Sequence, residues 1–243
     1  DTPERAEKTE HMMNRMRQVT EVFGVTEQSQ PLVETLYTEY LDVLNRHFEH
    51  YPYLLGWKPC IGDFGLLAPM YAHLGRDPYP ASLMQKRAPR VYRWVERMNR
   101  ADQDVPEFFT PGTDFLENDE VPETLMAVLR AVAEDFVPET RAAAERINDW
   151  LGQQQPEAGA TAVGRLGNLV GRAEFSVRGQ TITALASPYR FYLLQRVQAI
   201  YAGLPLAEQA SVEQMLQACG MHEMLSIKLD RSIGRADNLE VWL

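Results

Sequence analysis

The chain has 243 residues, of which 45% are hydrophobic and 24% are charged, and its formal net charge is −10. These proportions are typical of a globular chain with one large domain or two small ones. The acidic excess repels phosphate backbones and anionic lipid head groups, so nucleic acid is not an expected partner. No apolar run approaches the roughly 20 residues that span a bilayer, so a membrane is not expected either. The sequence has two cysteines, which argues against a disulfide framework and predicts a cytoplasmic protein.

Two amphipathic helices are expected at the start of the chain. Thr2-Pro3-Glu4 has the pattern of a helix opening, with Thr at the cap and Pro in the first turn. This helix should run to about Phe23, and Gly24 should end it. A second helix is expected from near Pro31 to about residue 51, because its apolar residues repeat at the spacing of one helical face. The apolar face of the first helix consists of Met12, Met13, Met16, Val19, Val22 and Phe23.

Residues 53–80 form the most informative segment of the sequence. Asp63 stands three residues after Cys60, where its carboxylate can reach back to a free backbone N–H of a helix's first turn. Pro59 and Phe64 occupy the positions of a hydrophobic staple. Apolar residues fall on every side of residues 61–74, which predicts a helix surrounded by other helices. Pro69 should bend this helix, and Gly75 with the prolines of residues 77–80 should end it.

The next part of the chain is also expected to be helical. One helix should start at Pro89 and close near Arg100, and residues 102–119 read as a surface loop because of their prolines, glycine and acidic residues. A long helix should follow over residues 122–151, with a kink at Pro138. Residues 153–161 are expected to be a polar connector.

The pattern changes after residue 160. Residues 174–184 alternate apolar and polar side chains around Arg178-Gly179, which predicts a hairpin and is the one convincing β signal in the chain. Such a hairpin must lie against the helices to be stable. Two or three helices are expected to complete the chain, over residues 188–201, 206–219 and 221–229.

Residues 53–80 resemble the central buried helix of the C-terminal domain of glutathione S-transferases. That superfamily opens this helix with Ser or Thr, two further residues and Asp. Its bacterial members commonly continue into a Leu-Gly-Arg-Asp-Pro-Tyr-Pro loop, which stands here at residues 74–80. Residues 88–89 and 94–98 match as well, and the resemblance is good over about residues 32–99 and weaker beyond. Cys60 departs from the pattern because a thiol is a poorer cap than the usual hydroxyl.

A complete glutathione transferase begins with a thioredoxin-like half, which supplies a cis-proline strand, a Glu-Ser pair that grips glutathione, and a residue that activates its thiol. No such pattern precedes the first helix here, so the catalytic residue is unknown and glutathione is a cofactor by resemblance alone. Two explanations are open. The chain is the C-terminal part of a longer transferase, which its start at Asp1 favours, or it is a stand-alone helical domain, for which the residues after 160 leave room.

The resemblance also implies which residues to consider as a site. The first helix of the family's helical domain shapes the apolar substrate pocket, which gives His11, Asn14, Arg15 and Met16 as substrate-binding candidates; a solvated helical face is the competing interpretation and the favoured one. The partner would be a small hydrophobic electrophile. The family's habit of dimerising implies a homodimer.

Three further patterns have plainer interpretations. Arg90, Arg93, Arg97 and Arg100 make a basic stripe, which acidic neighbours should neutralise. His47 and His50 have a spacing that suits two metal ligands, but a zinc site needs three or four, so no metal is expected. Cys60 and Asp63 are expected to be a structural helix cap.

The expected fold is therefore all-α, a bundle like the glutathione-transferase C-terminal domain with a small β-hairpin and additional C-terminal helices. Residues 1–160 would form the helical domain, and residues 161–243 the hairpin and helices packed on the same core. The expected function is that of a glutathione S-transferase-like protein that conjugates or exchanges glutathione on electrophilic compounds when complete. Its status as an enzyme depends on the thioredoxin-like half. The alternative is a non-catalytic helical domain that binds a ligand or a partner protein.

Overall fold

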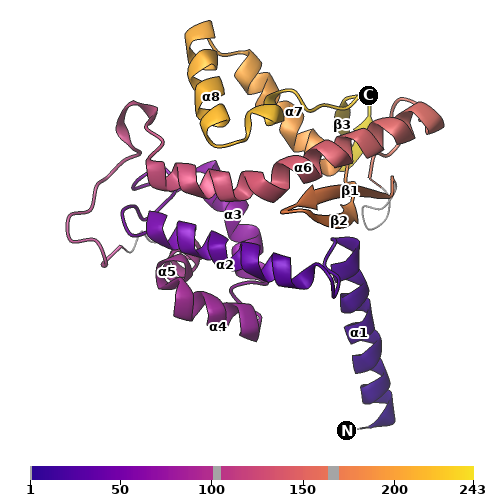
Figure 1. Cartoon of the computed structure of the whole chain (residues 1–243), viewed down its shortest axis with the longest axis horizontal. Helices are drawn as coiled ribbons and strands as arrows, with labels where there is room; N and C mark the ends of the chain where they lie inside the picture. Colours follow the sequence, from indigo (N-terminus) through magenta and orange to yellow (C-terminus); the bar gives the residue numbers. More distant parts are fainter. Residues whose placement is uncertain (1, 101–104, 164–169) are drawn as a thin grey trace. The chain divides into compact units, whose positions relative to one another are not determined.

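The computed structural model describes residues 2–100, 105–163 and 170–243 (Figure 1). Within these residues it contains eight α-helices and two two-stranded antiparallel sheets, so the predicted dominance of helices is confirmed. The chain forms two compact units: Glu34–Val132 is one, and Asp1–Val33 with Ala133–Leu243 is the other. The boundary expected near residue 160 stays a prediction.

The unit Glu34–Val132 has a core of aliphatic and aromatic side chains. Phe48 and Trp94 stack at its centre with their rings 5.2 Å apart, and both are almost fully buried. Burial of rings of this size supplies much of the free energy that holds such a unit together. The unit contains most of α2 (Gln30–His47), α3 (Ile61–Ala72), α4 (Pro78–Arg87), α5 (Pro89–Met98), the 3-10 turn η1 (Glu117–Asp119) and the first part of α6 (Glu123–Gln154).

Helix α4 was not predicted, because the prolines of residues 77–80 were expected only to end the preceding helix. Pro78 and Pro80 instead lie in the first turn of α4, with Asp77 as its N-cap. The first backbone N–H groups of a helix have no partner within it, so a proline there loses nothing. Helix α5 starts at Pro89 as predicted, directly after Ala88.

The helix predicted at residues 61–74 is present as α3, but the prediction that other helices surround it is wrong for the described residues. Asp63 and Met70 are its buried side chains, and α5 packs against it. Ile61 is 91% exposed and Phe64 is 58% exposed. The expectation failed because apolar composition on all sides shows what a helix could bury, not what covers it.

In the other unit, α6 provides the longest helix, with bounds close to those predicted. Strands β1 (Arg172–Val177) and β2 (Gln180–Leu185) pair with Val177 opposite Gln180, so the predicted hairpin is confirmed. Arg178 and Gly179 both have positive φ angles, of 51° and 76°. A two-residue turn of this kind matches the natural twist of the strands. Arg178 also binds Glu134 of α6 with N···O distances of 2.6 and 2.8 Å, which holds the hairpin against that helix.

The C-terminal part of the chain differs from the prediction in two ways. Helices α7 (Tyr189–Ala202) and α8 (Leu206–Ala218) are present as expected, but residues 221–229 contain only the 3-10 turn η3 (His222–Leu225). A second hairpin, β3 (Ile233–Ala236) and β4 (Leu239–Trp242), was not predicted. The side-chain amide of Gln198 binds the carbonyls of Met224 and Ile227 at 2.8 Å each, which holds the chain in the non-helical path that leads to this hairpin.

The second hairpin closes the core of this unit. Trp242 is fully buried and stacks on Trp150 of α6 with the ring centroids 5.9 Å apart. Asp237 and Asn238 form the turn with φ angles of 48° and 62°, values that Asp and Asn tolerate better than most residues. That dipeptide is the sequence signal that could have revealed the hairpin.

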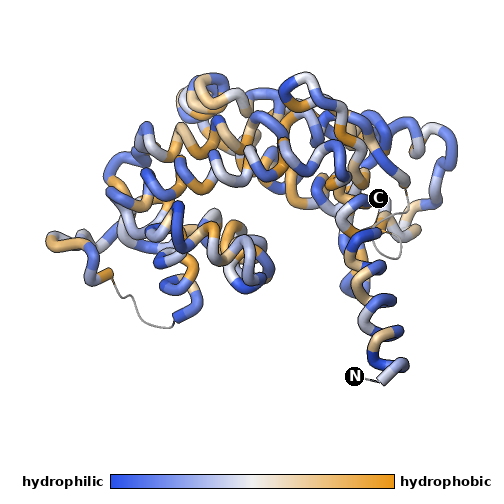
Figure 2. The backbone as a smooth tube through the Cα atoms, turned by 60° about the horizontal axis from the view of Figure 1, so that its bottom comes forward, coloured by the Kyte–Doolittle hydropathy of each residue, from blue (hydrophilic) through white to orange (hydrophobic). Residues whose placement is uncertain are grey.

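Helix α1 (Pro3–Val22) begins as predicted, with the Thr2 hydroxyl accepting from the N–H of Arg5 at 3.4 Å. None of its residues is buried. Within its own unit it meets β2 near its C-terminal end and extends away from the hairpin (Figure 1). Apolar and polar residues alternate along its trace (Figure 2).

Candidate functional site

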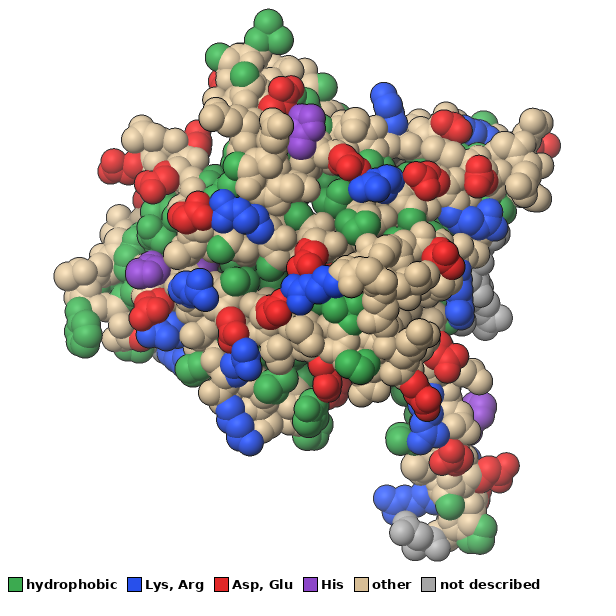
Figure 3. Space-filling view, viewed as in Figure 1, with side chains coloured by type: hydrophobic (Ala, Val, Ile, Leu, Met, Phe, Trp, Pro, Cys, Tyr) green, Lys and Arg blue, Asp and Glu red, His purple; other side chains and the backbone are tan. Residues whose placement is uncertain are grey.

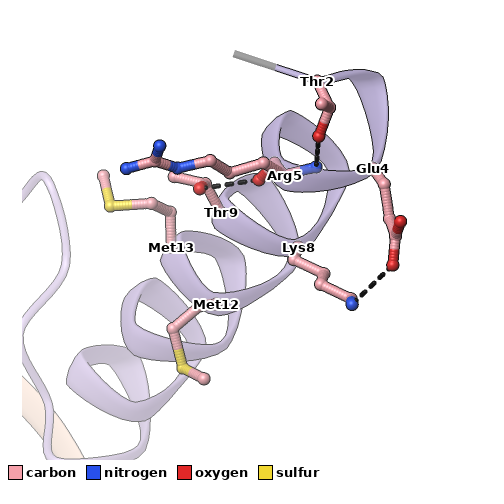
Figure 4. A pocket seen from close by; sticks show the side chains of 7 residues that line it. All are labelled: Thr2, Glu4, Arg5, Lys8, Thr9, Met12 and Met13. Atoms are coloured by element: carbon pink, nitrogen blue, oxygen red, sulfur yellow. Dashed lines mark hydrogen bonds and ion pairs between the residues drawn. The ribbon is translucent and has the colours of Figure 1, made fainter.

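The four predicted substrate-binding residues all lie on α1, in its middle turns. His11, Asn14, Arg15 and Met16 are exposed, and Asn14 accepts a 2.7 Å hydrogen bond from Arg17. A shallow cavity of about 610 Å³ runs along the first turns of the same helix (Figure 4). None of the four predicted residues lines it, so this structure does not gather them into a pocket. Their role in substrate binding stays a prediction. The cavity is lined by Thr2, Glu4, Arg5, Lys8, Thr9, Met12 and Met13.

All residues around that cavity belong to one helix. The close-up shows Glu4 and Lys8 joined by an ion pair (Figure 4); its N···O distance is 2.7 Å, and the two side chains are 75% and 76% exposed. Exposed ion pairs at this spacing contribute a few tenths of a kcal/mol, about 0.3 to 0.5. A ligand there would meet one flank of a helix and no opposite wall, so the cavity by itself is not a binding site.

A buried carboxylate holds the start of α3. Asp63 is fully buried and its carboxylate accepts three hydrogen bonds: from the N–H of Leu54 at 3.1 Å, the N–H of Cys60 at 2.9 Å and Trp94 Nε1 at 2.9 Å. It therefore joins the helix start to the preceding turn and to α5. A buried carboxylate is tolerated in such a place because donors replace its lost hydration.

Cys60 is the N-cap of α3, as the sequence indicates. Its side chain and the backbone N–H of Asp63 form the second half of a capping box. Burial raises the pKa of the Cys60 thiol, with a lesser raising effect from the Asp63 side chain. The thiol is therefore protonated at neutral pH, and since the thiolate is the nucleophile, Cys60 is poorly suited to covalent catalysis.

A recess of about 390 Å³ adjoins the Cys60 side of this helix start. Its walls are two chain segments that pair with one another: the N–H of Leu116 binds the carbonyl of Leu55, and the N–H of Trp57 binds the carbonyl of Asp114, both at 3.0 Å. Gly56 lies between them with φ 111°, and a Cβ there would stand 3.0 Å from the nitrogen of Leu116. The recess is lined by Leu55, Cys60, Phe115, Leu116, Asp119, Glu120 and Val121.

The two histidines considered as metal ligands have separate environments. His47 is buried, with Nδ1 2.9 Å from the Thr124 hydroxyl and Nε2 3.3 Å from the Tyr53 carbonyl. Burial lowers the pKa of His47. His50 is exposed. Among the residues that the structure describes, no group of three or more His, Cys, Asp or Glu could hold a metal ion.

The predicted basic stripe of α5 is divided between surface and core. Arg90 pairs with Glu49 at 3.1 Å, and Arg93 pairs with Glu96 at 3.2 Å. Arg97 is 4% exposed, donates to the Pro52 carbonyl at 2.9 Å and pairs with Glu107. Its burial was not predicted, and the stripe is not a continuous cationic surface. On the face drawn in Figure 3, acidic and basic side chains are likewise interspersed.

Among the described residues, no helix is both long enough and apolar enough to cross a bilayer. Comparisons of the chain with protein-family models, with curated proteins and with solved structures find no match.

Proposed function

We propose that this chain is the helical, hydrophobic-substrate-binding part of a glutathione S-transferase-like protein. The observation that carries the proposal is the buried Asp63 at the third position of α3, which binds its own helix start, the preceding turn and Trp94. The bond from this carboxylate to its own helix start is what the resemblance over residues 32–99 implies, whereas the exposed outer face of α3 departs from the buried helix that the resemblance also implies. The fold of the family's helical domain is part of the same proposal.

Each compact unit has an exposed apolar surface that supports the idea of a further structural part. Met12, Met13 and Met16 of α1 are each close to half exposed. The outer face of α3, with Ile61 and Phe64, is open in the same way. Apolar faces of this kind mark surfaces that another protein segment or a ligand covers. The proposal assigns a thioredoxin-like half to the outer face of α3 and a second copy of the chain to the apolar face of α1.

The chemistry would be attack of a glutathione thiolate on a small electrophile, or exchange of its sulfur. The described residues of this chain offer apolar surface for the electrophile, whereas the Cys60 thiol is held protonated by burial. Binding and activation of glutathione are therefore assigned to the other half. The cytoplasm remains the predicted location.

Retention on immobilised glutathione tests this proposal. The chain alone should pass through the resin, whereas the natural gene product should be retained and should carry roughly 80–100 extra residues upstream, the size of a small domain. Measurement of the intact mass of the natural gene product gives the number of extra residues. Retention of this chain alone, or a natural product without an upstream domain, would contradict the proposal.

A homodimer is the expected assembly, and the apolar face of α1 is the surface proposed for it. Light scattering coupled to gel filtration should give twice the mass of the chain. Met16→Glu would place a charge in that face and should shift the mass to that of a monomer. Asn14→Glu, on the opposite side of the helix, is the matched control and should remain dimeric. A monomer for the unmodified chain would remove the homodimer from the proposal.

The alternative function, a non-catalytic interaction domain, has its own supporting observation. Tyr189, Leu193, Val197 and Ile200 recur at helical spacing on α7, and each is between 42% and 70% exposed. Such a stripe suits a partner helix. A natural gene product without a thioredoxin-sized half would favour this function over the transferase.

A further inference from the structure

His47 is a fully buried imidazole that has no role in the proposed function. It lies in the last turn of α2, and its two ring nitrogens reach two other segments of the unit Glu34–Val132. Nδ1 is 2.9 Å from the hydroxyl of Thr124, in the first turn of α6, and Nε2 is 3.3 Å from the carbonyl of Tyr53. One side chain therefore joins a helix end, a turn and a helix start.

The partners determine which nitrogen carries the proton. The Tyr53 carbonyl can only accept a hydrogen bond, so Nε2 must be the N–H donor. Nδ1 is then unprotonated and accepts from the Thr124 hydroxyl. Both nitrogens are satisfied in this neutral tautomer, and the ring lies 5.4 Å from Phe48 and 5.5 Å from Tyr51, measured between centroids.

The carboxylates and the guanidinium around the ring bind other partners. Asp63 of α3 favours the protonated ring electrostatically, but its carboxylate already accepts three hydrogen bonds. His50, after α2, opposes protonation. Arg97 of α5 lies over the Tyr53 ring and pairs with Glu107. On α6, Glu123 pairs with Arg130 at 2.6 Å on the surface. Among the described residues, neither nitrogen of His47 bonds a carboxylate.

We infer that His47 is an acid-sensitive latch that holds the end of α2, the Tyr53 turn and the start of α6 together only while its imidazole is neutral. A second proton would place a donor at Nδ1, so the Thr124 hydroxyl would have to turn its own hydrogen away and accept instead. It would also place a charge inside an aromatic core without a counter-ion in direct contact, which is costly. Separation of the end of α2 from the Tyr53 turn and the start of α6 would relieve both the mismatch with the Thr124 hydroxyl and the burial of the charge.

The latch also controls the recess beside Cys60. His47 holds the Tyr53–Gly56 turn through the carbonyl of Tyr53, and Asp63 holds it through the N–H of Leu54. Leu55, in the same turn, forms part of the wall of the recess. Release of the His47 hydrogen bond frees one side of that turn. Cys60, which is half-buried in the closed form, then becomes more accessible.

The direction of the pH effect follows from burial. The pKa of His47 is lowered in the folded chain, mainly by burial and in spite of the hydrogen bond to Tyr53. An unfolded histidine titrates near 6.5. Between these two values the unfolded chain binds a proton that the folded chain does not. The stabilisation is therefore complete above about pH 6.5 and falls as the pH drops toward the folded value, by up to about tenfold in the folding equilibrium constant per pH unit.

Urea unfolding of the whole chain between pH 5 and 8 tests the latch, with His47→Gln and, as the matched control, the exposed His50→Gln. The unmodified chain and His50→Gln should lose stability in parallel below about pH 6.5. His47→Gln should be less stable at pH 8 and should lack that pH-dependent loss. The same acid slope in His47→Gln as in the control would overturn the inference.

Two measurements on the unmodified chain stand if His47→Gln does not fold. Nitrogen-detected NMR of the His47 ring should show the Nε2–H tautomer at pH 7 and titration below 6.5. An Nδ1–H tautomer, or titration at or above 6.5, would overturn the inference. Labelling of Cys60 with an acid-active disulfide reagent should accelerate as the pH falls through this range. The buried Cys219 serves as internal control. A Cys60 labelling rate that decreases steadily as the pH is lowered would contradict the latch.

Discussion

Asp63 shows how much of a fold one buried side chain can organise. Its carboxylate satisfies two backbone N–H groups and the indole N–H of Trp94. Asp63→Ala should lower the free energy of unfolding by about 3 kcal/mol or more, because three buried donors lose their acceptor. Urea denaturation measures this loss.

The matched control is Asp77→Ala. Asp77 also stands at a helix start, but its side chain makes no capping bond and its contact with His73, at 3.6 Å, is solvated. Its replacement should change stability by less than about 0.5 kcal/mol. Equal losses for the two variants would mean that Asp63 is not the acceptor described.

Gly24 is required by the close approach of α1's end to the hairpin. Its φ is 82°, and a Cβ would lie 2.6 Å from Cγ2 of Ile182. Gly24→Ala should cost about 3 kcal/mol, since strain and a steric clash add. Gly179→Ala has a similar φ of 76° with no atom within 4 Å, so it should cost only about 1 kcal/mol. Thermal unfolding of the two variants separates clash from strain, and similar midpoints would place the end of α1 away from β2.

For single residues, the sequence predicted the role of those whose partners are close by in the chain. It missed the role of those whose partners are far away in the chain. Cys60 and Asp63 are three residues apart, so helix geometry alone suggested the cap. The burial of His47 depends on Thr124, 77 positions away in the sequence. Arg97 was assigned to a surface stripe because its helical spacing matches Arg90 and Arg93, and its partner, the Pro52 carbonyl, lies outside any local pattern.

Helix α3 has two sides with opposite exposure. Met70 is 1% exposed, whereas Phe64 on the other side is largely open. Met70→Ala should reduce stability by about 3 kcal/mol through loss of packing, and Phe64→Ser should cost less than about 1 kcal/mol. Chemical denaturation at low and high protein concentration measures both. A large, concentration-dependent loss for Phe64→Ser would show that a second copy covers this face.

Whole elements were predicted best where a single strong periodicity runs through them. The long amphipathic pattern of α6 and the alternation of β1 and β2 each indicate one structure over many residues. Helix α4 and the β3–β4 hairpin are short, and neither has a sequence pattern strong enough to predict it. Proline both ends a helix and opens one, and the four-residue strands of the second hairpin are stabilised by packing around Trp242 rather than by their own pattern.

For the whole molecule, the sequence pattern was sufficient for the helical class, whereas the domain boundary that it predicts stays a prediction. The sequence suggested one break, near residue 160, where the pattern changes from helix to hairpin. One of the two compact units draws on both ends of the chain, Asp1–Val33 and Ala133–Leu243, and the other is the continuous segment Glu34–Val132. Contacts between distant segments determine such a division, and no periodicity within a window of the sequence records them. The family resemblance stays a proposal at this scale.

The stacked pair of Trp150 and Trp242 gives the chain an optical marker of its own. Two indoles 5.9 Å apart and inclined by 29° should couple their electronic transitions, and we expect paired bands of opposite sign in ultraviolet circular dichroism. The signal would report whether the last strand is docked, independently of total helix content. It would vanish in any form of the protein, including one trimmed by a carboxypeptidase, in which that strand has come away while the helices persist.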